Sequence, residues 1–315
     1  MDLSIIVPVY NTKSFVKECL ESLLSDEDGS LKYEILLIDN GSSDGSRALC
    51  EELAKKHKCV EVLNCEKAGA AAVRNFGLRR AKGKYVWFVD SDDYCKKEAM
   101  AYRDIIKTDA DVVMIMAEKV DEKGCEMTGI GAKLYAIDPE NDSEWRRKFV
   151  KIGVAPWQIV CKREFLLKNN LFYDEGMIHE DMALLSSFVL YTDKIVLSRK
   201  ITYCYRQRTG SVLHQEKWSE REFDIFAALE LLSRRFEKAK KFNKYKDEIE
   251  YFYIWNLLDD AARAFKRFSE ARKGYGMIRK TMKKRFPNWR KNKYFLKQPI
   301  MVRARCYTAY FGVVW

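Results

Sequence analysis

Acidic side chains follow directly after an apolar run in the segment KYVWFVDSDDYC, which spans residues 84–95. Residues 85–89 have the composition of a buried strand, and Asp90, Asp92 and Asp93 come next. Carboxylates this close repel one another and lose hydration beside a core, so we expect a positive partner. Carboxylate oxygens suit Mg²⁺ or Mn²⁺, which commonly keep one or two of them together with substrate phosphates. The segment therefore predicts a divalent metal site that receives a phosphorylated ligand.

Two further polar loops follow predicted strands. The run SIIVPV at residues 4–9 leads into Tyr10 and Asn11, and the run YEILLI at residues 33–38 leads into the turn sequence DNGSSDGS. Strands that alternate with helices and lack tight hairpins predict a parallel sheet, whose ligands bind beyond the carboxyl ends of the strands. We therefore expect the three loops to line one crevice.

The rest of the chain supplies the elements that would hold these loops. Apolar runs predict further strands at 60–63, 85–89 and 111–117, and helical spacing predicts helices at 14–24, 46–57, 70–81 and 96–107. Beyond them we expect helices at 157–167, 181–190, 218–241, 245–272 and 275–286, with short strands at 194–197 and 202–205. The predicted fold class is α/β, with a mostly parallel, Rossmann-like nucleotide-binding sheet flanked by helices and a basic helical C-terminal region.

Two familiar phosphate-binding motifs do not fit. A dinucleotide-binding GxGxxG turn is missing after the first strand, where VPVYNT stands. The segment GLRRAKGK at residues 77–84 has five residues between its glycines, and Tyr85 follows where a P-loop needs Ser or Thr. These differences argue against a dinucleotide-dependent dehydrogenase and against a P-loop enzyme.

Four motifs, taken in order, resemble those of family 2 glycosyltransferases. They are VPVYN (7–11), IDNGSSDGS (38–46), AGAAAVRNFGLRRAKGKYVWFVDSDD (68–93) and HED (179–181). The resemblance covers about residues 3–211 and departs from the family pattern at Asn40, where a second adjacent acid is usual. It implies the GT-A fold and transfer of a sugar, with inversion, from a nucleotide sugar to an acceptor hydroxyl. The resemblance is to the bacterial members that take part in the synthesis of polysaccharide or lipopolysaccharide.

The same resemblance implies a UDP-sugar donor, either a UDP-hexose or a UDP-N-acetylhexosamine, with Mn²⁺ or Mg²⁺ as cofactor. Asp92 and Asp90 would hold the metal, and Tyr10 would stack on the base. Arg208 or His214 would close over the diphosphate. The implied nucleotide-sugar contacts are Pro8, Tyr10, Asn11, Asp39, Arg74, Asn75, Asp90, Ser91, Asp92 and Arg208.

The HED motif implies the acceptor side of the site. Attack of an alcohol on an anomeric carbon needs a base, and the family places an Asp second in an acidic pair at a helix start. That residue is Asp181 here, with Glu180 as the second catalytic candidate. Trp157, His179 and Asp93 are the candidate acceptor contacts. Structural alternatives remain, because the acidic pair could merely favour the helix dipole, Trp157 could be a core residue and Asp93 could orient its loop.

Composition limits the classes of protein to which this chain can belong. The 315 residues contain no apolar run long enough for a transmembrane helix, and MDLSIIVPVY lacks the features of a signal peptide. Nine scattered cysteines without a CxxC pair favour free thiols in a reducing cytoplasm. We expect a cytoplasmic protein with a catalytic domain at 1–214 and a helical region at 215–315. Within the catalytic domain, about 1–117 would bind the nucleotide sugar and about 118–214 the acceptor.

The net charge of +11 belongs to the C-terminal region. Residues 215–315 carry 25 Lys and Arg against 12 Asp and Glu, whereas residues 1–214 carry 32 against 34. The helix predicted at 275–286 is basic and amphipathic, which is typical of a membrane-surface element. Its apolar face consists of Tyr275, Ile278, Met282 and Phe286. We expect an anionic membrane surface and a glycan or lipid-linked glycan acceptor as partners, on the inner face of the membrane, unless this region is only a solvated subdomain.

Other functions fit parts of the sequence. A sugar nucleotidyltransferase shares the sheet and metal chemistry but needs a glycine-rich basic loop after the first strand, which VPVYNTKSF lacks. A catalytically silent binder of nucleotide sugars or of nucleic acid would be favoured by loss of HED or DSDD, and both are present. We expect no nucleic-acid partner, because no recognised binding module occurs.

Overall fold

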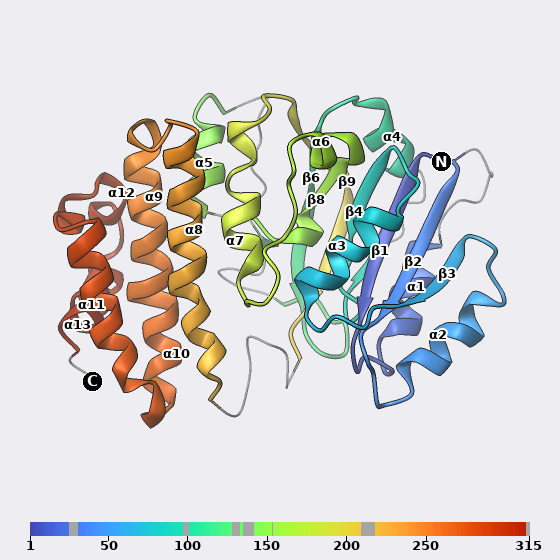
Figure 1. Ribbon diagram of the computed structural model, residues 1–315, viewed down its shortest axis with the longest axis horizontal. Coiled ribbons are helices and arrows are strands. Elements are labelled where there is room, and N and C mark those ends of the chain that lie inside the picture. The colour runs from blue at the N-terminus through green and yellow to red at the C-terminus, as the bar shows by residue number, and fades with distance from the viewer. Residues whose placement is uncertain are drawn as a thin grey trace. The chain divides into compact units, whose positions relative to one another are not determined.

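A computed structural model of the protein describes residues 1–24, 31–96, 101–127, 133–134, 142–152, 154–208 and 218–312 (Figure 1). The chain divides into two compact units. The first, the sheet unit, comprises Met1–Ser143, Ala155–Gly176 and Thr192–His214. The second, the helical unit, comprises Glu144–Val154, Met177–Tyr191 and Gln215–Trp315. The chain therefore passes between the units more than once, and two segments from before residue 214 belong to the helical unit.

The described part of the sheet unit forms a nine-stranded sheet in the order β3-β2-β1-β4-β8-β6-β9-β5, with β7 paired to β6. Its strands are β1 (Leu3–Val9), β2 (Tyr33–Asp39), β3 (Val60–Asn64), β4 (Tyr85–Phe88), β5 (Tyr94–Cys95), β6 (Val112–Val120), β7 (Lys133–Leu134), β8 (Ile159–Lys162) and β9 (Ile195–Arg206). Strands β3, β2, β1 and β4 run parallel, as do β6 and β9, whereas β8, β5 and β7 are antiparallel to their neighbours. This topology confirms the predicted α/β fold with a mostly parallel sheet.

Helices cover both faces of the sheet (Figure 1). On one face, Ile5 and Val7 of β1 join a buried core cluster with side chains of α1 (Val16–Leu23), α2 (Ser46–Ala54) and α4 (Ala101–Lys107). On the other face, α3 (Ala70–Arg80) packs closely on β1 and β2. A Cβ on Gly77 of α3 would lie 2.5 Å from Ile6 Cγ2, so glycine permits this approach. Burial on both faces explains why residues 5–9 of β1 are all apolar rather than alternating with polar ones.

The prediction of a helix at residues 157–167 is wrong in its first half. Residues 159–162 form β8, which pairs with β4 on one side and β6 on the other, and only α6 (Arg163–Lys168) is helical. The segment IVCK is short and apolar, and such a run fits a strand as well as a helix, so its pairing partners decide the outcome. The two short strands predicted at 194–197 and 202–205 are parts of the single strand β9.

The helical unit is built from α5 (Trp145–Ile152), α7 (Glu180–Leu185), α8 (Asp224–Lys238), α9 (Lys246–Tyr253), α10 (Ala262–Arg267), α11 (Lys273–Arg285), α12 (Lys293–Leu296) and α13 (Ile300–Phe311). A π-helical stretch, Ile254–Ala261, joins α9 to α10, and the extended backbone of Phe268 ends the helix predicted at 245–272. Buried side chains such as Leu229, Phe236 and Phe265 form its core. No helix among the described residues is both long and apolar enough to cross a bilayer.

Candidate active site

The loops that follow β1, β2 and β4 are hydrogen-bonded to one another. Asn11 donates its backbone N–H to Ser42 Oγ at 3.1 Å, and its side-chain oxygen accepts the N–H of Ser43 at 2.9 Å. The hydroxyl of Thr12 lies 2.9 Å from that of Ser91 in the DSDD turn. These contacts confirm the prediction that the three loops meet at the carboxyl edge of the parallel strands.

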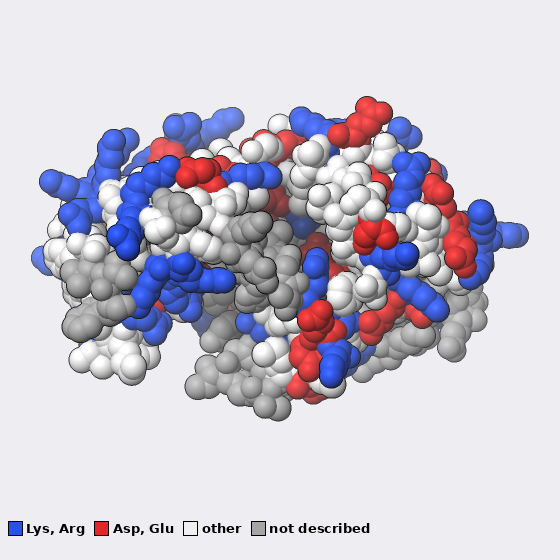
Figure 2. Space-filling view, turned by 90° about the horizontal axis from the view of Figure 1, so that it is seen from below, with Lys and Arg blue, Asp and Glu red and all other residues white. Residues whose placement is uncertain are grey.

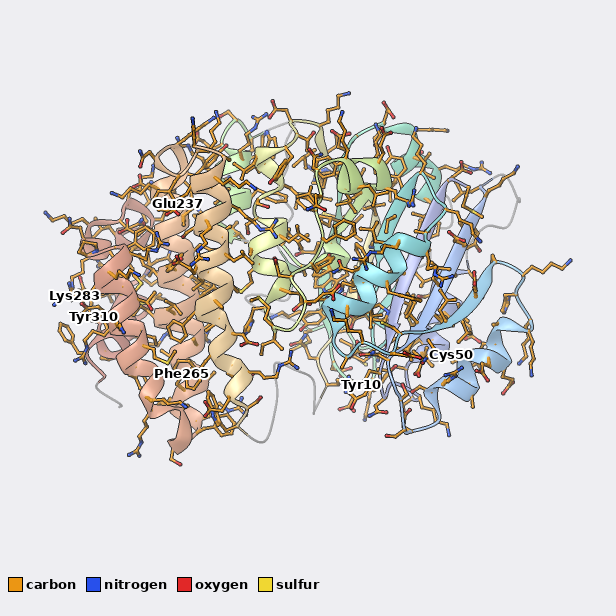
Figure 3. The ribbon with its side chains drawn as sticks, viewed as in Figure 1. Tyr10, Cys50, Glu237, Phe265, Lys283 and Tyr310 are labelled. Carbon is orange, nitrogen blue, oxygen red and sulfur yellow. The ribbon has the colours of Figure 1, made fainter. Side chains whose placement is uncertain are left out.

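The first loop exposes an aromatic ring. Pro8 belongs to β1, and Tyr10 follows the end of that strand with 61% of its surface exposed (Figure 3). Asn11 adopts a left-handed backbone conformation, with φ of 52°, which asparagine tolerates better than most residues. The bonds from Asn11 to the second loop hold this turn, so Asn11 shapes the loop from which Tyr10 projects.

The second loop is organised by its own side chains. Asp39 is 2% exposed, and its carboxylate accepts the N–H groups of Gly41 at 3.2 Å and Ser42 at 3.3 Å. Asn40 donates its side-chain amide to the carbonyl oxygens of Cys65 and Lys67. Since a carboxylate has no N–H to donate, an acid at position 40 could not make these two bonds.

Two neighbouring residues of helix α3 have different partners: Arg74 contacts the DSDD turn, and Asn75 contacts segment 173–175. The Arg74 guanidinium is largely buried and donates to Asp90 Oδ1 at 3.1 Å. Asn75 is 1% exposed, and its amide binds the main chain of Tyr173 and the side chain of Glu175. The predicted direct contact of Asn75 with the nucleotide sugar is therefore not favoured, because its amide groups are bound to segment 173–175.

The DSDD turn presents two carboxylates and buries a third. Asp92 Oδ2 accepts a hydrogen bond from Arg208 Nε at 2.6 Å, and the side chains of Asp90 and Asp92 are partly exposed. Asp93 is 2% exposed, with one oxygen bound to the Tyr203 hydroxyl at 2.6 Å and the other to the Arg206 backbone N–H at 2.8 Å. Burial, and then the charges of Asp92 and Asp90, raise the pKa of Asp93 well above its usual value. Asp93 thus orients the turn, and its predicted contact with the acceptor does not agree with this burial.

Arg206 is a site residue that the sequence prediction did not include. Its guanidinium donates to the carbonyl oxygens of Asp92 at 2.9 Å and Glu122 at 2.7 Å, and to Glu18 Oε2 at 2.6 Å. The guanidinium carbon lies 5.2 Å from the centre of the Phe15 ring. The short strand predicted at 202–205 stops just before this arginine, whereas β9 extends to it and directs its side chain at the DSDD turn.

Trp157 lies in the core of the sheet unit. It is 5% exposed and stacks on Tyr203 with ring centres 4.5 Å apart and on Tyr205 at 5.2 Å. Its carbonyl oxygen accepts the indole N–H of Trp87 at 2.9 Å. This packing agrees with the alternative of a core tryptophan and not with the predicted contact to an acceptor.

The HED segment begins α7 in the helical unit, as the prediction of a helix start at this point required. Glu180 is buried and Asp181 is half-buried in the first turn. His179 has a left-handed backbone with φ of 64°, and its Nε2 lies 3.9 Å from Glu222 Oε2. Burial lowers the pKa of His179, which favours the neutral imidazole. His214, the alternative to Arg208, lies outside the described residues.

The carboxylates of the site fit a divalent cation whose remaining ligands come from the substrate. Among the described residues no group of three or more His, Cys, Asp and Glu side chains could enclose a metal alone. Asp90 and Asp92 nevertheless offer carboxylate oxygens from one turn, and hard cations often bind to one or two carboxylates plus phosphates and water. The sheet-edge loops are therefore suited to a metal–diphosphate ligand.

Comparisons with known proteins bear on the family of the chain. Residues 4–191, more than half of the chain, match the model of the family described as glycosyl transferase family 2. Glycosyltransferase GlyG of Streptococcus pneumoniae is 28% identical over 276 residues, which are 80% of this chain and 90% of GlyG.

Two solved structures resemble the whole chain. Staphylococcus aureus TarS 1–349 in complex with UDP-GlcNAc has a TM-score of 0.74 at 19% identity, covering 98% of this chain and 89% of that one. Mannosyltransferase PcManGT from Pyrobaculum calidifontis, in complex with GDP-Man and Mn²⁺, has a TM-score of 0.55 at 16% identity, covering 99% and 87%. At these identities the two structures bear on the fold, which is GT-A. The match over residues 4–191 shows that the chain belongs to glycosyltransferase family 2.

Proposed function

We propose that this protein is an inverting enzyme that transfers a sugar from a UDP-hexose or UDP-N-acetylhexosamine to a hydroxyl group of a glycan or lipid-linked glycan. The observation that carries the proposal is the hydrogen-bonded junction of three strand-end loops, which combines the exposed ring of Tyr10 with the carboxylates of Asp90 and Asp92. The UDP-GlcNAc complex of TarS supports the choice of a UDP-sugar, and the family favours sugar transfer over nucleotidyl transfer.

The donor would be held at its uracil base and at its diphosphate. Tyr10 offers a flat apolar surface on which a uracil ring can stack. Asp90 and Asp92 would hold Mn²⁺ or Mg²⁺, which, when bound, would neutralise charge on the diphosphate. The Mn²⁺ in the complex of PcManGT supports this assignment. Arg208, once released from Asp92, has a planar set of N–H donors that suits a phosphate.

Asp181 would act as the general base. Its carboxylate would take the proton of the acceptor hydroxyl while the hydroxyl oxygen forms a bond to C1 of the sugar. The bond from C1 to the diphosphate oxygen would break on the opposite face, so that UDP leaves and the configuration at C1 is inverted. Glu180, buried beside it, would hold the base in place or contact the sugar.

We further propose that the acceptor lies at an anionic membrane or cell-surface polymer, reached through the basic helical unit. Figure 2 shows Lys and Arg side chains gathered over this unit, and Lys283 (labelled in Figure 3) and Lys284 of α11 are exposed. The predicted mode of binding needs a correction. The apolar face of α11 is buried in the unit's own core and cannot enter a bilayer, as the exposures of Tyr275 (9%), Ile278 (0%), Met282 (0%) and Phe286 (1%) indicate.

A different apolar corner would make the membrane contact. Ile300 and Met301 are each 74% exposed at the start of α13, and Leu296 at the end of α12 is 51% exposed. Lys297 lies between them in the sequence and is exposed. Exposed apolar side chains beside basic ones suit an interface with anionic lipid.

Donor and metal are tested by thermal stabilisation of the purified protein with UDP-, GDP- and dTDP-sugars, with and without Mn²⁺. We expect stabilisation by UDP-sugars that depends on the metal and is lost in Asp92→Ala but kept in Glu51→Ala, an exposed acid on α2. Asp181→Asn should bind UDP like the wild type and transfer no sugar. Full transfer by Asp181→Asn would refute the assignment of the base.

The membrane contact is tested by flotation with vesicles of neutral lipid and of neutral lipid mixed with phosphatidylglycerol, at low salt. We expect binding to the anionic vesicles only, weakened in the double variant Ile300→Ser/Met301→Ser. Met127→Ser is the matched control, because Met127 is also exposed but lies in the sheet unit. Equal binding to both vesicles would refute the membrane proposal.

A further inference from the structure

The segment that leads into the HED motif is held by a residue of the C-terminal region. Asp224, the first residue of α8, accepts the backbone N–H of Ile178 on Oδ2 at 3.0 Å. A hydrogen bond to a carboxylate is stronger than one between neutral groups. Helix α7 also packs against α8 within the helical unit. The start of α7 is thus fastened both by a charged hydrogen bond and by helix packing.

The residue after Ile178 has an unusual backbone. His179 has a φ of 64° and no side-chain capping bond at the start of α7. A left-handed conformation costs energy in a residue other than glycine and persists where the surroundings enforce it. The bond from Ile178 to Asp224 restrains the chain on one side of this turn, and the carbonyl oxygen of His179 accepts the N–H of Met182 at 3.3 Å on the other. Between these two restraints stand Glu180 and Asp181.

We propose that Asp224 is a positioning residue for the general base, so that the C-terminal region forms part of the catalytic apparatus. This inference rests on the proposed role of Asp181. Asp224 suits the task, because the N-terminal end of the fifteen-residue helix α8 favours a carboxylate. Glu222, near the imidazole of His179, faces the same turn. Without the bond to Asp224, the turn at His179 would relax and the Asp181 carboxylate would lose its orientation toward the acceptor hydroxyl.

Two substitutions of Asp224 distinguish a role in positioning Asp181 from a general contribution to stability. Asp224→Ala removes the acceptor, whereas Asp224→Asn keeps an oxygen that can accept the Ile178 N–H. Glu237→Ala is the control, since Glu237 lies on the same helix (Figure 3) but pairs with Arg285 of α11. We expect Asp224→Ala to lower kcat about 100-fold, the size of effect that misplacing a reacting group by about 1 Å can produce. KM for the donor and affinity for UDP with Mn²⁺ should change less than about threefold, and Asp224→Asn should recover most of kcat.

A double-mutant cycle decides through which residue Asp224 acts. If it acts through Asp181, adding Asp224→Ala to Asp181→Asn should leave the residual rate unchanged. A further large fall in the double variant, or a kcat of Asp224→Ala within twofold of the wild type, would overturn the inference. The inference would also be overturned if both Asp224 variants lost thermal stability to the same extent and this loss accounted for their lower activity. The proposed function fails separately, if Asp181→Asn by itself keeps full activity.

Discussion

Arg208 donates its Nε–H to Oδ2 of Asp92 at 2.6 Å, so the carboxylate that we propose as a metal ligand already has a cationic partner. Both side chains are partly exposed, at 19% and 22%. A guanidinium and a divalent ion compete for the same oxygen, because each satisfies the same negative charge. Binding of the metal to Asp92 would therefore free Arg208 for the diphosphate.

Removing this arginine should have opposite effects on metal binding and on catalysis. In Arg208→Ala we expect Mn²⁺ to bind several-fold more tightly in the absence of nucleotide, and kcat to fall by about 10²-fold, since a charge that stabilises the leaving group is lost. Mn²⁺ titration by calorimetry and steady-state kinetics measure the two effects. Arg47→Ala, which removes an exposed arginine paired with Glu51, should change neither. Unchanged Mn²⁺ affinity in Arg208→Ala would show that the two cations do not compete.

Trp157 should affect stability more than recognition of the acceptor. Because its ring stacks on both Tyr203 and Tyr205 in the core, Trp157→Ala should cost about 3–5 kcal/mol of unfolding free energy. Trp157→Phe should retain most of that stability. Denaturant unfolding measures the loss, and acceptor KM of Trp157→Phe provides the second observation. A stable variant with a greatly raised acceptor KM would restore the contact predicted from the sequence.

A pair of glycines tests the packing of α3 on the sheet. A Cβ at Gly77 would lie 2.5 Å from Ile6 Cγ2 and 2.8 Å from Ile38 Cδ1, so Gly77→Ala should destabilise the protein by about 1–3 kcal/mol. The Cβ of alanine at Gly276 of α11 would meet nothing within 4 Å. Gly276→Ala should therefore be neutral or stabilise by up to about 1 kcal/mol, because alanine favours a helix. Equal effects of the two changes in thermal unfolding would contradict the close approach of α3.

The half-buried imidazole of His179 should make stability depend on pH. Since the folded-state pKa lies below the usual 6.5, the unfolded chain binds a proton first as pH falls. The contribution of the neutral imidazole is complete above about pH 6.5 and is lost as pH falls toward the folded-state pKa. Asparagine also tolerates positive φ, so His179→Asn should remove this part of the acid slope of Tm below about pH 6.5. An acid slope of Tm that is the same in His179→Asn as in the wild type would contradict the prediction.

Local patterns in the sequence determined the sheet edge that carries the donor site. Strands β1 and β2 each contain an apolar run, at residues 5–9 and 35–38, and β4 is apolar throughout, because helices bury both faces of the sheet; such runs are readable without a structure. Carboxyl ends of parallel strands share one edge, which is why Asp39 and the DSDD turn could be assigned to the same place in advance. The helix start at Glu180 also follows from local signals.

Only the tertiary structure decided what the individual polar and aromatic side chains of the site do. Asp93 and Asp92 are adjacent acids, yet Asp93 is buried because the Tyr203 hydroxyl reaches it from 110 residues away. Asn75 likewise binds Tyr173, 98 residues further on. The apolar face of α11 gives a third example. Its pattern of apolar and basic residues predicts that one face is shielded from water, but only the packing of the surrounding helices shows that the core of the unit, and not a membrane, shields it. Whether a carboxylate or an apolar face meets solvent depends on partners distant in sequence, and local spacing carries no information about them.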